Sequence, residues 1–458
     1  MSVLDRTALR AGIILAVGFL FALAVTRQWN LLAGNFEPTS WIWTWRDLGI
    51  LKTAALCLPP FLLICWVLWR DERAVPLKLW TALALLVLSN YLLQLLSTLA
   101  DPRGIGLVQQ IVNSPVATSY FTDAAAIQRP LEWLSHFQDQ NLGLHSVTHP
   151  PGPILFYYAF FKLFGVKSGA FIGGCVVGLL ASLGVAMMYA FTGLWTNDRR
   201  ARLTSSAFYA ILPAITLFFP EFDQVYPILS MLLILCGVNA LNARAFAKYA
   251  ACTGAAFFAA TFFAYNLLTC GIFLLYFGLY YLQSGKWSRS AWERLLQVSA
   301  TACGVCVGLY LALWLATGYD PLATFQHALV SQAKMQTRPY LPFPLWDPYD
   351  FFVGTGITAL PLLVFYLKRL WDESRSGQSD SQRQAALTVV ALATILTVDL
   401  SGLLRGESTR VWLFLQPLVV APVAIELSRF PLNWRLAIFS VQWWILVCLR
   451  ARMSFINP

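Results

Sequence analysis

The sequence predicts an all-α polytopic membrane protein. Hydrophobic residues make up 58% of the 458 residues and charged residues only 12%, and the mean hydropathy is +0.63. Soluble domains carry about 25% charged residues, so this chain has too few charges to cover a soluble surface. The apolar residues fall into runs of about 20, the length with which a helix crosses the hydrocarbon core of a bilayer.

Thirteen runs are predicted as transmembrane helices. They lie near 9–26, 48–69, 79–99, 169–195, 202–219, 226–243, 249–264, 266–283, 295–317, 351–367, 385–400, 411–427 and 435–449. Along the single membrane domain 1–458, the predicted parts are three N-terminal spans in 1–99, a loop at 100–168, central spans in 169–317, a second loop at 318–350 and C-terminal spans in 351–458.

Basic residues indicate which helix ends face the cytoplasm. With the N-terminus inside, 19 of the 32 Lys and Arg residues fall in the short loops of the cytoplasmic side, as the positive-inside rule requires. This holds only if the apolar run 153–164 does not cross, and at about 12 residues it is too short for a span. We therefore predict an interfacial or re-entrant helix at 153–164, with both long loops on the outer face of a bacterial plasma membrane. A cleaved signal peptide ending near Ala22-Leu-Ala24 is the alternative for the N-terminus.

Composition and motifs exclude several function classes. The net charge of +10 lies in short connectors rather than in long polar segments, so we expect membrane lipids and not nucleic acid as partners. The nine cysteines lie in or beside apolar runs, where packing is expected and disulfides are not; this includes the CxxC spacing at 303–306. Nucleotide-binding glycine loops and the HExxH zinc motif do not occur in the sequence.

The first long loop holds the first candidate site residues. Asp101 directly follows a span, and Asp123 lies shortly after Tyr120 in Ser-Tyr-Phe-Thr-Asp. The apolar spacing at 126–134 then predicts an amphipathic helix on the membrane surface. Both acids have the alternative role of ordinary turn or solvated loop residues.

The same loop closes with His149-Pro-Pro-Gly152. The prolines restrict the backbone before them, and Pro153 suits the first turn of the following helix. His149 is therefore expected at a helix entrance, near free backbone N–H groups and the positive end of the helix dipole, where an anion such as phosphate is stabilised. A histidine that only packs at the interface is the alternative.

Two shorter outer turns carry further candidates. Glu221, Asp223 and Tyr226 precede a span, and acids at membrane depth are costly and usually functional. They are expected to bind sugar hydroxyls, a basic residue or a divalent cation such as Mg or Mn.

The second turn, Arg405-Gly-Glu407-Ser-Thr-Arg410, places three charged residues directly before the predicted span 411–427. Its arginines can clamp phosphate oxygens through paired N–H donors. Snorkelling of the arginine side chains to the lipid headgroups is the alternative.

In this arrangement the sequence resembles the GT-C superfamily of integral membrane glycosyltransferases. Asp123, His149-Pro-Pro-Gly152 and Lys162-Leu-Phe-Gly165 match the family order of an outer-loop acid, a His-Pro-Pro-Gly segment and a Leu-Phe-Gly turn, with His149 standing 26 positions after Asp123. Two spans more than is usual precede the loop, and the acidic pair of many members is absent, so either Asp101 or Asp123 is left as the base.

The resemblance implies inverting transfer of a sugar from a polyprenyl-phosphate donor to a glycan, lipid or protein acceptor. An outer-loop carboxylate then removes the hydroxyl proton, while Arg405, Arg410 and His149 stabilise the leaving phosphate. The loop 318–350 is expected to close over the donor. A lipid-linked sugar transporter or flippase, and a glycan polymerase or ligase, are the alternative functions.

Overall fold

The computed structural model describes residues 3–29, 43–336, 338–374 and 379–456. Its regular structure is helical, apart from two strands of two residues each, β1 (Thr44–Trp45) and β2 (Met453–Ser454). The helices up to residue 242 are α1 (Val3–Thr26), α2 (Ile50–Asp71), α3 (Leu79–Thr98), α4 (Gly106–Val112), α5 (Tyr120–Ala126), α6 (Pro130–Ser135), η2 (Phe137–Asp139), η3 (Ser146–Thr148), α7 (Gly152–Thr192), α8 (Arg199–Ala210), α9 (Pro213–Leu217), η4 (Phe222–Val225) and α10 (Tyr226–Asn242). The later helices are α11 (Phe246–Phe263), η5 (Tyr265–Thr269), α12 (Cys270–Ser284), α13 (Arg289–Thr317), α14 (Pro321–Met335), α15 (Phe343–Thr355), α16 (Ala359–Ser374), α17 (Ser379–Ser401), α18 (Ser408–Val411), η6 (Leu413–Leu415), α19 (Gln416–Ser428) and α20 (Leu432–Arg452).

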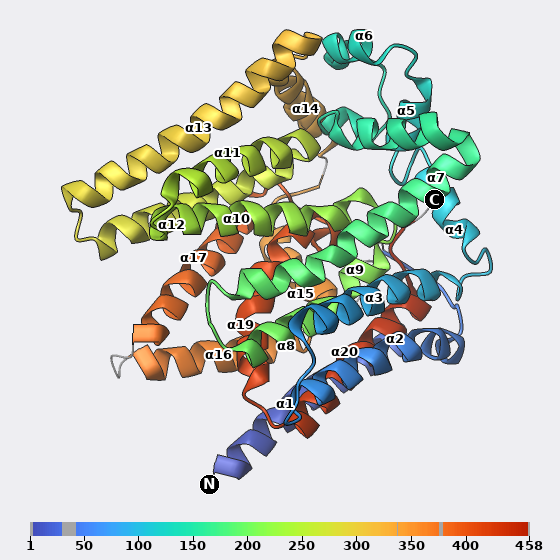
Figure 1. Ribbon diagram of the computed structural model, residues 1–458. Helices are drawn as coiled ribbons and strands as arrows, with labels where there is room; N and C mark the ends of the chain where they lie inside the picture. The colour runs from blue at the N-terminus through green and yellow to red at the C-terminus, as the bar shows by residue number, and fades with distance from the viewer. Residues whose placement is uncertain (1–2, 30–42, 337, 375–378, 457–458) are drawn as a thin grey trace.

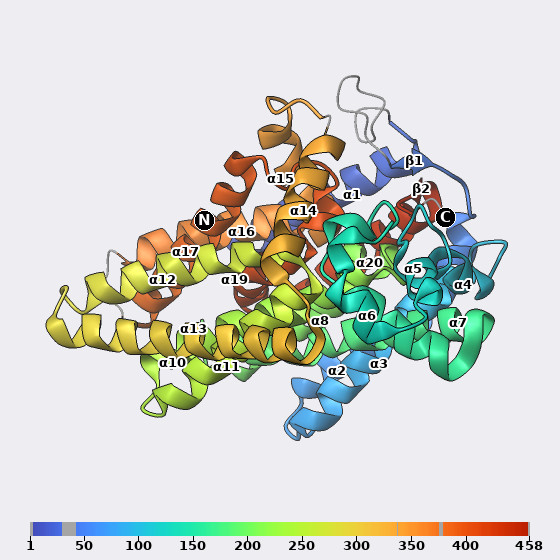
Figure 2. The same cartoon turned by 90° about the horizontal axis from the view of Figure 1, so that it is seen from above.

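The long helices pack side by side, and the short helices of the first loop gather at one end of the bundle. Figure 1 shows α4, α5 and α6 on the side where the C-terminus lies. The turns between α12 and α13 and between α16 and α17 lie at the opposite end, and Figure 2 shows the same division from above. The bundle therefore has one end with long connections and one with short turns, as the sequence predicts.

The number of spans differs from the predicted thirteen. Among the described residues, ten helices are long and apolar enough to cross a membrane, or eleven if α15 and α16, which meet at 102°, count as one bent span. The predicted span 202–219 is divided into α8 and α9 before Pro213, and the predicted span 411–427 is the shorter helix α19, with Pro417 in its first turn and Pro422 inside it. Proline removes a backbone donor and clashes with the preceding turn, so these apolar runs form short pieces.

The apolar run after Gly152 turns back instead of continuing straight. Helix α7 breaks at Gly165, where φ is 71° and ψ is −175°, a conformation that is essentially restricted to glycine. Beyond the break the two arms touch, because a Cβ at Gly169 would lie 2.7 Å from the carbonyl oxygen of Phe160. The run 153–164 is thus a separate helical arm, and its place at the membrane surface stays a prediction.

The amphipathic helix predicted around 126–134 is instead two short helices. Helix α5 ends at Ala126, and α6 begins at Pro130 after an extended Arg129. A residue before proline is pushed out of the helical region, which explains the break. Of the predicted apolar positions in α6, Leu134 is buried and Leu131 is exposed.

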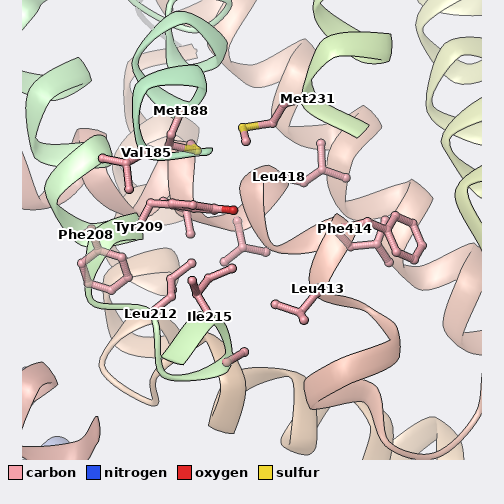
Figure 3. Packing of buried hydrophobic residues seen from close by; sticks show 14 of the residues in the cluster. Val185, Met188, Phe208, Tyr209, Leu212, Ile215, Met231, Leu413, Phe414 and Leu418 are labelled. Carbon is pink, nitrogen blue, oxygen red and sulfur yellow. The ribbon is translucent and has the colours of Figure 1, made fainter. Parts of the chain in front are cut away.

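The hydrophobic core runs through most of the bundle, and its part next to the candidate site lies between α7, α8, α9, α10 and α19. Figure 3 shows part of it, with the labelled side chains of Val185, Met188, Phe208, Tyr209, Leu212, Ile215, Met231, Leu413, Phe414 and Leu418. Ile215 shortly precedes Glu221, and Leu413 shortly follows Arg410. Packing in this core therefore fixes both segments whose polar residues form the candidate site.

Candidate active site

Arg410 is at the centre of a buried series of ion pairs. Its Nη2 lies 2.7 Å from Oε2 of Glu407, and its Nη1 lies 3.4 Å from Oε2 of Glu221. Oε1 of Glu407 accepts a hydrogen bond of 2.8 Å from Nη2 of Arg338, which comes from the second long loop. Glu407 has a φ of 58°, a left-handed conformation that is uncommon outside glycine. Acidic and basic side chains thus alternate along the series, and removing Arg410 or Glu407 would take away the partner of a buried charge.

Two aspartates of α15 hold the turn that carries Glu407 and Arg410. Asp347 Oδ1 accepts a hydrogen bond of 2.8 Å from the backbone N–H of Gly406 and one of 2.5 Å from the hydroxyl of Ser408. Asp350 Oδ2 accepts the backbone N–H of Thr409 at 2.8 Å. Both aspartates are buried. One helix thereby fixes the turn at Gly406, Ser408 and Thr409.

The acidic turn before α10 supplies two carboxylates. Glu221 is only 2% exposed, whereas Asp223 in η4 is half-buried. The turn approaches α7 closely, because a Cβ at Gly178 would lie 2.4 Å from the ring of Phe219. Tyr226 begins α10 directly after it. The missing side chain at Gly178 therefore lets the turn reach the cluster.

The His-Pro-Pro-Gly segment places an imidazole beside these carboxylates. His149 Nδ1 lies 2.7 Å from the carbonyl oxygen of His145; since a carbonyl only accepts, Nδ1 carries the hydrogen and the neutral ring has its lone pair at Nε2. The ring meets Tyr120 edge-on at 5.5 Å between centroids. Gly152 fits against α11, where a Cβ would lie 2.3 Å from the carbonyl oxygen of Phe262. The glycine of the motif is therefore needed for close packing.

Burial and charge set different protonation states for the two glutamates. Burial raises the pKa of Glu221 to about 8, because Arg410 offsets the burial only in part. Burial also acts to raise the pKa of Glu407, but Arg410 and Arg338 outweigh it and hold this pKa below its ordinary value. The pKa of Arg410 is lowered by burial and raised more strongly by Glu407, Glu221 and Asp223, so it is raised overall. At neutral pH, Glu407 and Arg410 are therefore ionised, while Glu221 mostly holds a proton.

The imidazoles and the phenol of the cluster are neutral. Burial lowers the pKa of His149, although Asp223 partly offsets it. Burial together with the charge of Arg410 lowers the pKa of His145 to about 4. Burial raises the pKa of Tyr120 well above its ordinary value. These three residues can therefore donate or accept hydrogen bonds without changing charge near neutral pH.

Most of the residues predicted from the sequence meet in this cluster. It contains Tyr120, His149, Glu221, Asp223, Tyr226, Glu407 and Arg410. Arg405 lies at its edge, where its charge acts on Asp347 and its backbone carbonyl accepts a hydrogen bond from Gln336.

The two predicted bases lie outside the ion-pair series. Asp123, one turn after Tyr120 on α5, accepts the backbone N–H of Gly143 at 3.0 Å, and burial raises its pKa. Asp101 is bound by Arg103 at 2.8 Å, and the hydrogen bonds from Arg103 lower its pKa to about 2. Asp101 shares no contact with the Arg410 cluster among the described residues, and the catalytic role of either acid stays a prediction.

Sequence reasoning missed several participants. Asp347 and Asp350 lie in a segment that we assigned to the second loop, but a pair of acids at helical spacing beside aromatic residues is a detectable signal of a buried polar role. His145 shows no feature that separates it from an interfacial histidine. Arg338 lies in the loop that is expected to close over the donor, and its ion pair with Glu407 was not foreseen.

The predicted divalent cation finds no ready site in the described part of the chain. There, no group of three or more His, Cys, Asp or Glu side chains is arranged to hold a metal ion. The carboxylates of Glu221 and Glu407 are bridged by the guanidinium of Arg410. Arg410 occupies the position that a cation would need between them, so these residues do not fit a metal in this arrangement.

Comparisons with known proteins bear on the fold. No protein-family model and no curated protein sequence matches this chain. Its fold is similar to the crystal structure of the oligosaccharyltransferase of Archaeoglobus fulgidus in complex with Zn and sulfate, with a TM-score of 0.51 and 14% sequence identity over 83% of this chain and 53% of that chain. The archaeal oligosaccharyltransferase AglB from Archaeoglobus fulgidus in complex with an inhibitory peptide and a dolichol-phosphate is less similar, with a TM-score of 0.37 and 13% identity over 81% of this chain and 50% of that chain. The chain spans about half the length of both. The first likeness confirms the predicted all-α, GT-C-like fold.

Proposed function

We propose that this chain is a membrane glycosyltransferase that moves a sugar from a polyprenyl-phosphate donor to a hydroxyl group of a glycan, lipid or protein acceptor. The observation that carries the proposal is the buried ion-pair series around Arg410, which joins segments far apart in the sequence. Its fold, which is similar to that of an oligosaccharyltransferase, supports this class of enzyme.

The donor phosphate is best accommodated at Nη1 of Arg410. The contact of Nη1 with Glu221 is long, at 3.4 Å, whereas Nη2 is held by Glu407 at 2.7 Å. A protonated Glu221 attracts Arg410 less and offers an O–H donor to a phosphate oxygen. Glu407 holds Nη2 and so keeps the planar guanidinium oriented with Nη1 directed at the phosphate. As the bond to the anomeric carbon breaks, the growing phosphate charge is stabilised by a fixed cation in a site of low dielectric.

Asp223 is the carboxylate best suited to act as the base. It is half-buried and has no ion pair of its own among the described residues, and its charge acts on His149. In the proposed step, the acceptor hydroxyl gives its proton to the carboxylate, and its oxygen attacks the anomeric carbon opposite the phosphate, which leaves with the bonding electron pair. The configuration is therefore inverted. Asp123, whose pKa is raised by burial, is the second candidate.

We further propose that the site faces the outer side of a bacterial plasma membrane and that the N-terminus is cytoplasmic. The turn between α12 and α13, which contains Lys286 and Arg289, lies at the end of the bundle away from α5 and α6. Basic turns mark the cytoplasmic side of membrane proteins. The Arg410 cluster would then face the compartment where lipid-linked sugars are used for envelope glycans.

The test is release of polyprenyl phosphate by the purified full chain in nanodiscs, supplied with a panel of polyprenyl-phosphate sugars and acceptors. We expect release from at least one donor and a fall of roughly 10²- to 10⁴-fold in turnover for Asp223→Asn, the usual contribution of a general base. A loss in Asp123→Asn with normal Asp223→Asn would assign the base to Asp123. No release from any donor would contradict the proposal and favour a transporter of lipid-linked sugars.

A further inference from the structure

A second cluster of charged residues lies where three candidate spans end. Helix α2 begins at Ile50, α3 ends at Thr98 and α20 ends at Arg452. The strands β1 and β2 pair antiparallel beside these helix ends, and Figure 2 shows them near the C-terminus. This basic cluster consists of Arg46, Arg103, Arg450 and Arg452 with the acids Asp101 and Asp47. It shares no residue with the Arg410 cluster.

Positive charge is in excess in the basic cluster. Asp101 accepts two hydrogen bonds from the guanidinium of Arg103, at 2.8 and 2.9 Å, while the third nitrogen of that group donates to Gln110 at 3.2 Å. Asp101 also lies 3.8 Å from Nη1 of Arg46. Arg450, which is 5% exposed, donates from Nε to the neutral carbonyl of Ser97 at 3.3 Å. Three guanidinium groups therefore face the single carboxylate of Asp101 among the described residues. Burial, followed by the charge of Arg450, lowers the pKa of Arg46 to about 9, as expected for crowded cations.

The basic cluster also contains several buried N–H donors without an acceptor among the described residues. They are Nε of Arg46, Nη2 of Arg450 and Nε of Arg452, and the adjacent Trp45 adds a fourth at Nε1. Buried polar groups are nearly always hydrogen-bonded, because an unmade bond leaves their desolvation uncompensated. All four atoms are donors, so the missing partner is an acceptor. Arg103, with 40% of its side chain exposed, leaves the cluster open on one side.

We propose that the basic cluster binds a phosphate group, supplied by the headgroup of an anionic phospholipid or by a free phosphate ion. Guanidinium groups present paired donors that match phosphate oxygens, and an anion neutralises the excess charge beside Asp101. The ends of α2, α3 and α20 place the cluster at the depth where headgroups lie. The proposal does not rest on the glycosyltransferase function.

The test measures binding to the purified full chain by native mass spectrometry, with phosphatidylglycerol and phosphatidylcholine as lipids, and by thermal shift with inorganic phosphate. We expect phosphatidylglycerol to bind more tightly than phosphatidylcholine if the source is a lipid, and phosphate alone to raise the unfolding temperature if it is the free ion. Arg103→Gln should weaken the observed binding about tenfold by removing one charge-assisted contact. Asp101→Asn should strengthen it, because a competing carboxylate is lost.

The matched control is Arg129→Gln, because Arg129 directly precedes α6, has 82% of its side chain exposed and pairs only with Glu132 among the described residues. It should leave binding unchanged. Equal effects of Arg103→Gln and Arg129→Gln, or no preference for the anionic lipid together with no response to phosphate, would overturn the proposal.

Discussion

Replacing Arg410 by lysine keeps the positive charge and removes the fork of donors. In the structure the guanidinium contacts Glu407 at 2.7 Å and Glu221 at 3.4 Å through different nitrogens. Lysine ends in a single ammonium group. This group can keep the contact with Glu407, but it cannot also reach the phosphate proposed at Nη1. One charge-assisted hydrogen bond is lost, which is worth about 1.5–3 kcal/mol. We therefore expect donor affinity to fall roughly 10- to 150-fold.

The assay compares donor KM and turnover for polyprenyl phosphate release, together with direct donor binding, in wild type and Arg410→Lys. Arg129→Lys, at an exposed position, is the matched control and should behave as wild type. Arg410→Ala is a poorer probe, because Glu221 would lose its partner and Glu407 would keep only Arg338, which destabilises the buried series itself. Unchanged donor affinity in a folded Arg410→Lys protein would refute the assignment of Arg410 to the phosphate.

Three other predictions concern the surroundings of Arg410. Because the pKa of Glu221 is raised to about 8, Glu221 is protonated below that pH and ionised above it; donor binding should weaken as the pH rises through 8, and a pH profile that persists in Glu221→Gln would contradict this role. Asp350 accepts from Thr409 and from the indole of Trp43 at 3.1 Å, so Asp350→Asn, which replaces one acceptor by a donor, should cost about 1–3 kcal/mol of stability and raise the donor KM; a lower unfolding temperature with unchanged KM would limit Asp350 to a structural role. A Cβ at residue 152 would lie 2.3 Å from the carbonyl oxygen of Phe262, so Gly152→Ala should destabilise the fold by about 1–3 kcal/mol, and an unchanged unfolding temperature would contradict this packing.

The fold class was predictable from two properties of the sequence, its high share of hydrophobic residues and its apolar runs of about 20 residues. Both are what a helix needs to lie in the hydrocarbon core of a bilayer. The count of spans was too high because of proline. Pro213 and Pro422 divide or shorten apolar runs that hydropathy alone treats as full spans. The short apolar run 153–164 predicted a separate helix, but not the break at Gly165 that ends it. Hydropathy carries no information on the backbone angle φ.

The candidate site was predictable where a charged residue stands directly beside an apolar run, as at Glu221 and Arg410. Such a position is costly unless the residue has a partner, and the two prove to be partners of each other at 3.4 Å. Asp101 has the same local signal but pairs with Arg103 instead. The sequence alone cannot tell these cases apart, because the choice of partner depends on which helix ends converge in space.

The most direct test of the central claim is a structure of the full chain bound to a non-hydrolysable polyprenyl-phosphonate sugar. The proposed function predicts phosphonate oxygens within hydrogen-bond distance of Arg410 Nη1, Glu221 displaced from its present contact, and the sugar beside Asp223 and His149. A phosphonate bound away from Arg410, with the series from Glu221 to Arg338 unchanged, would contradict it.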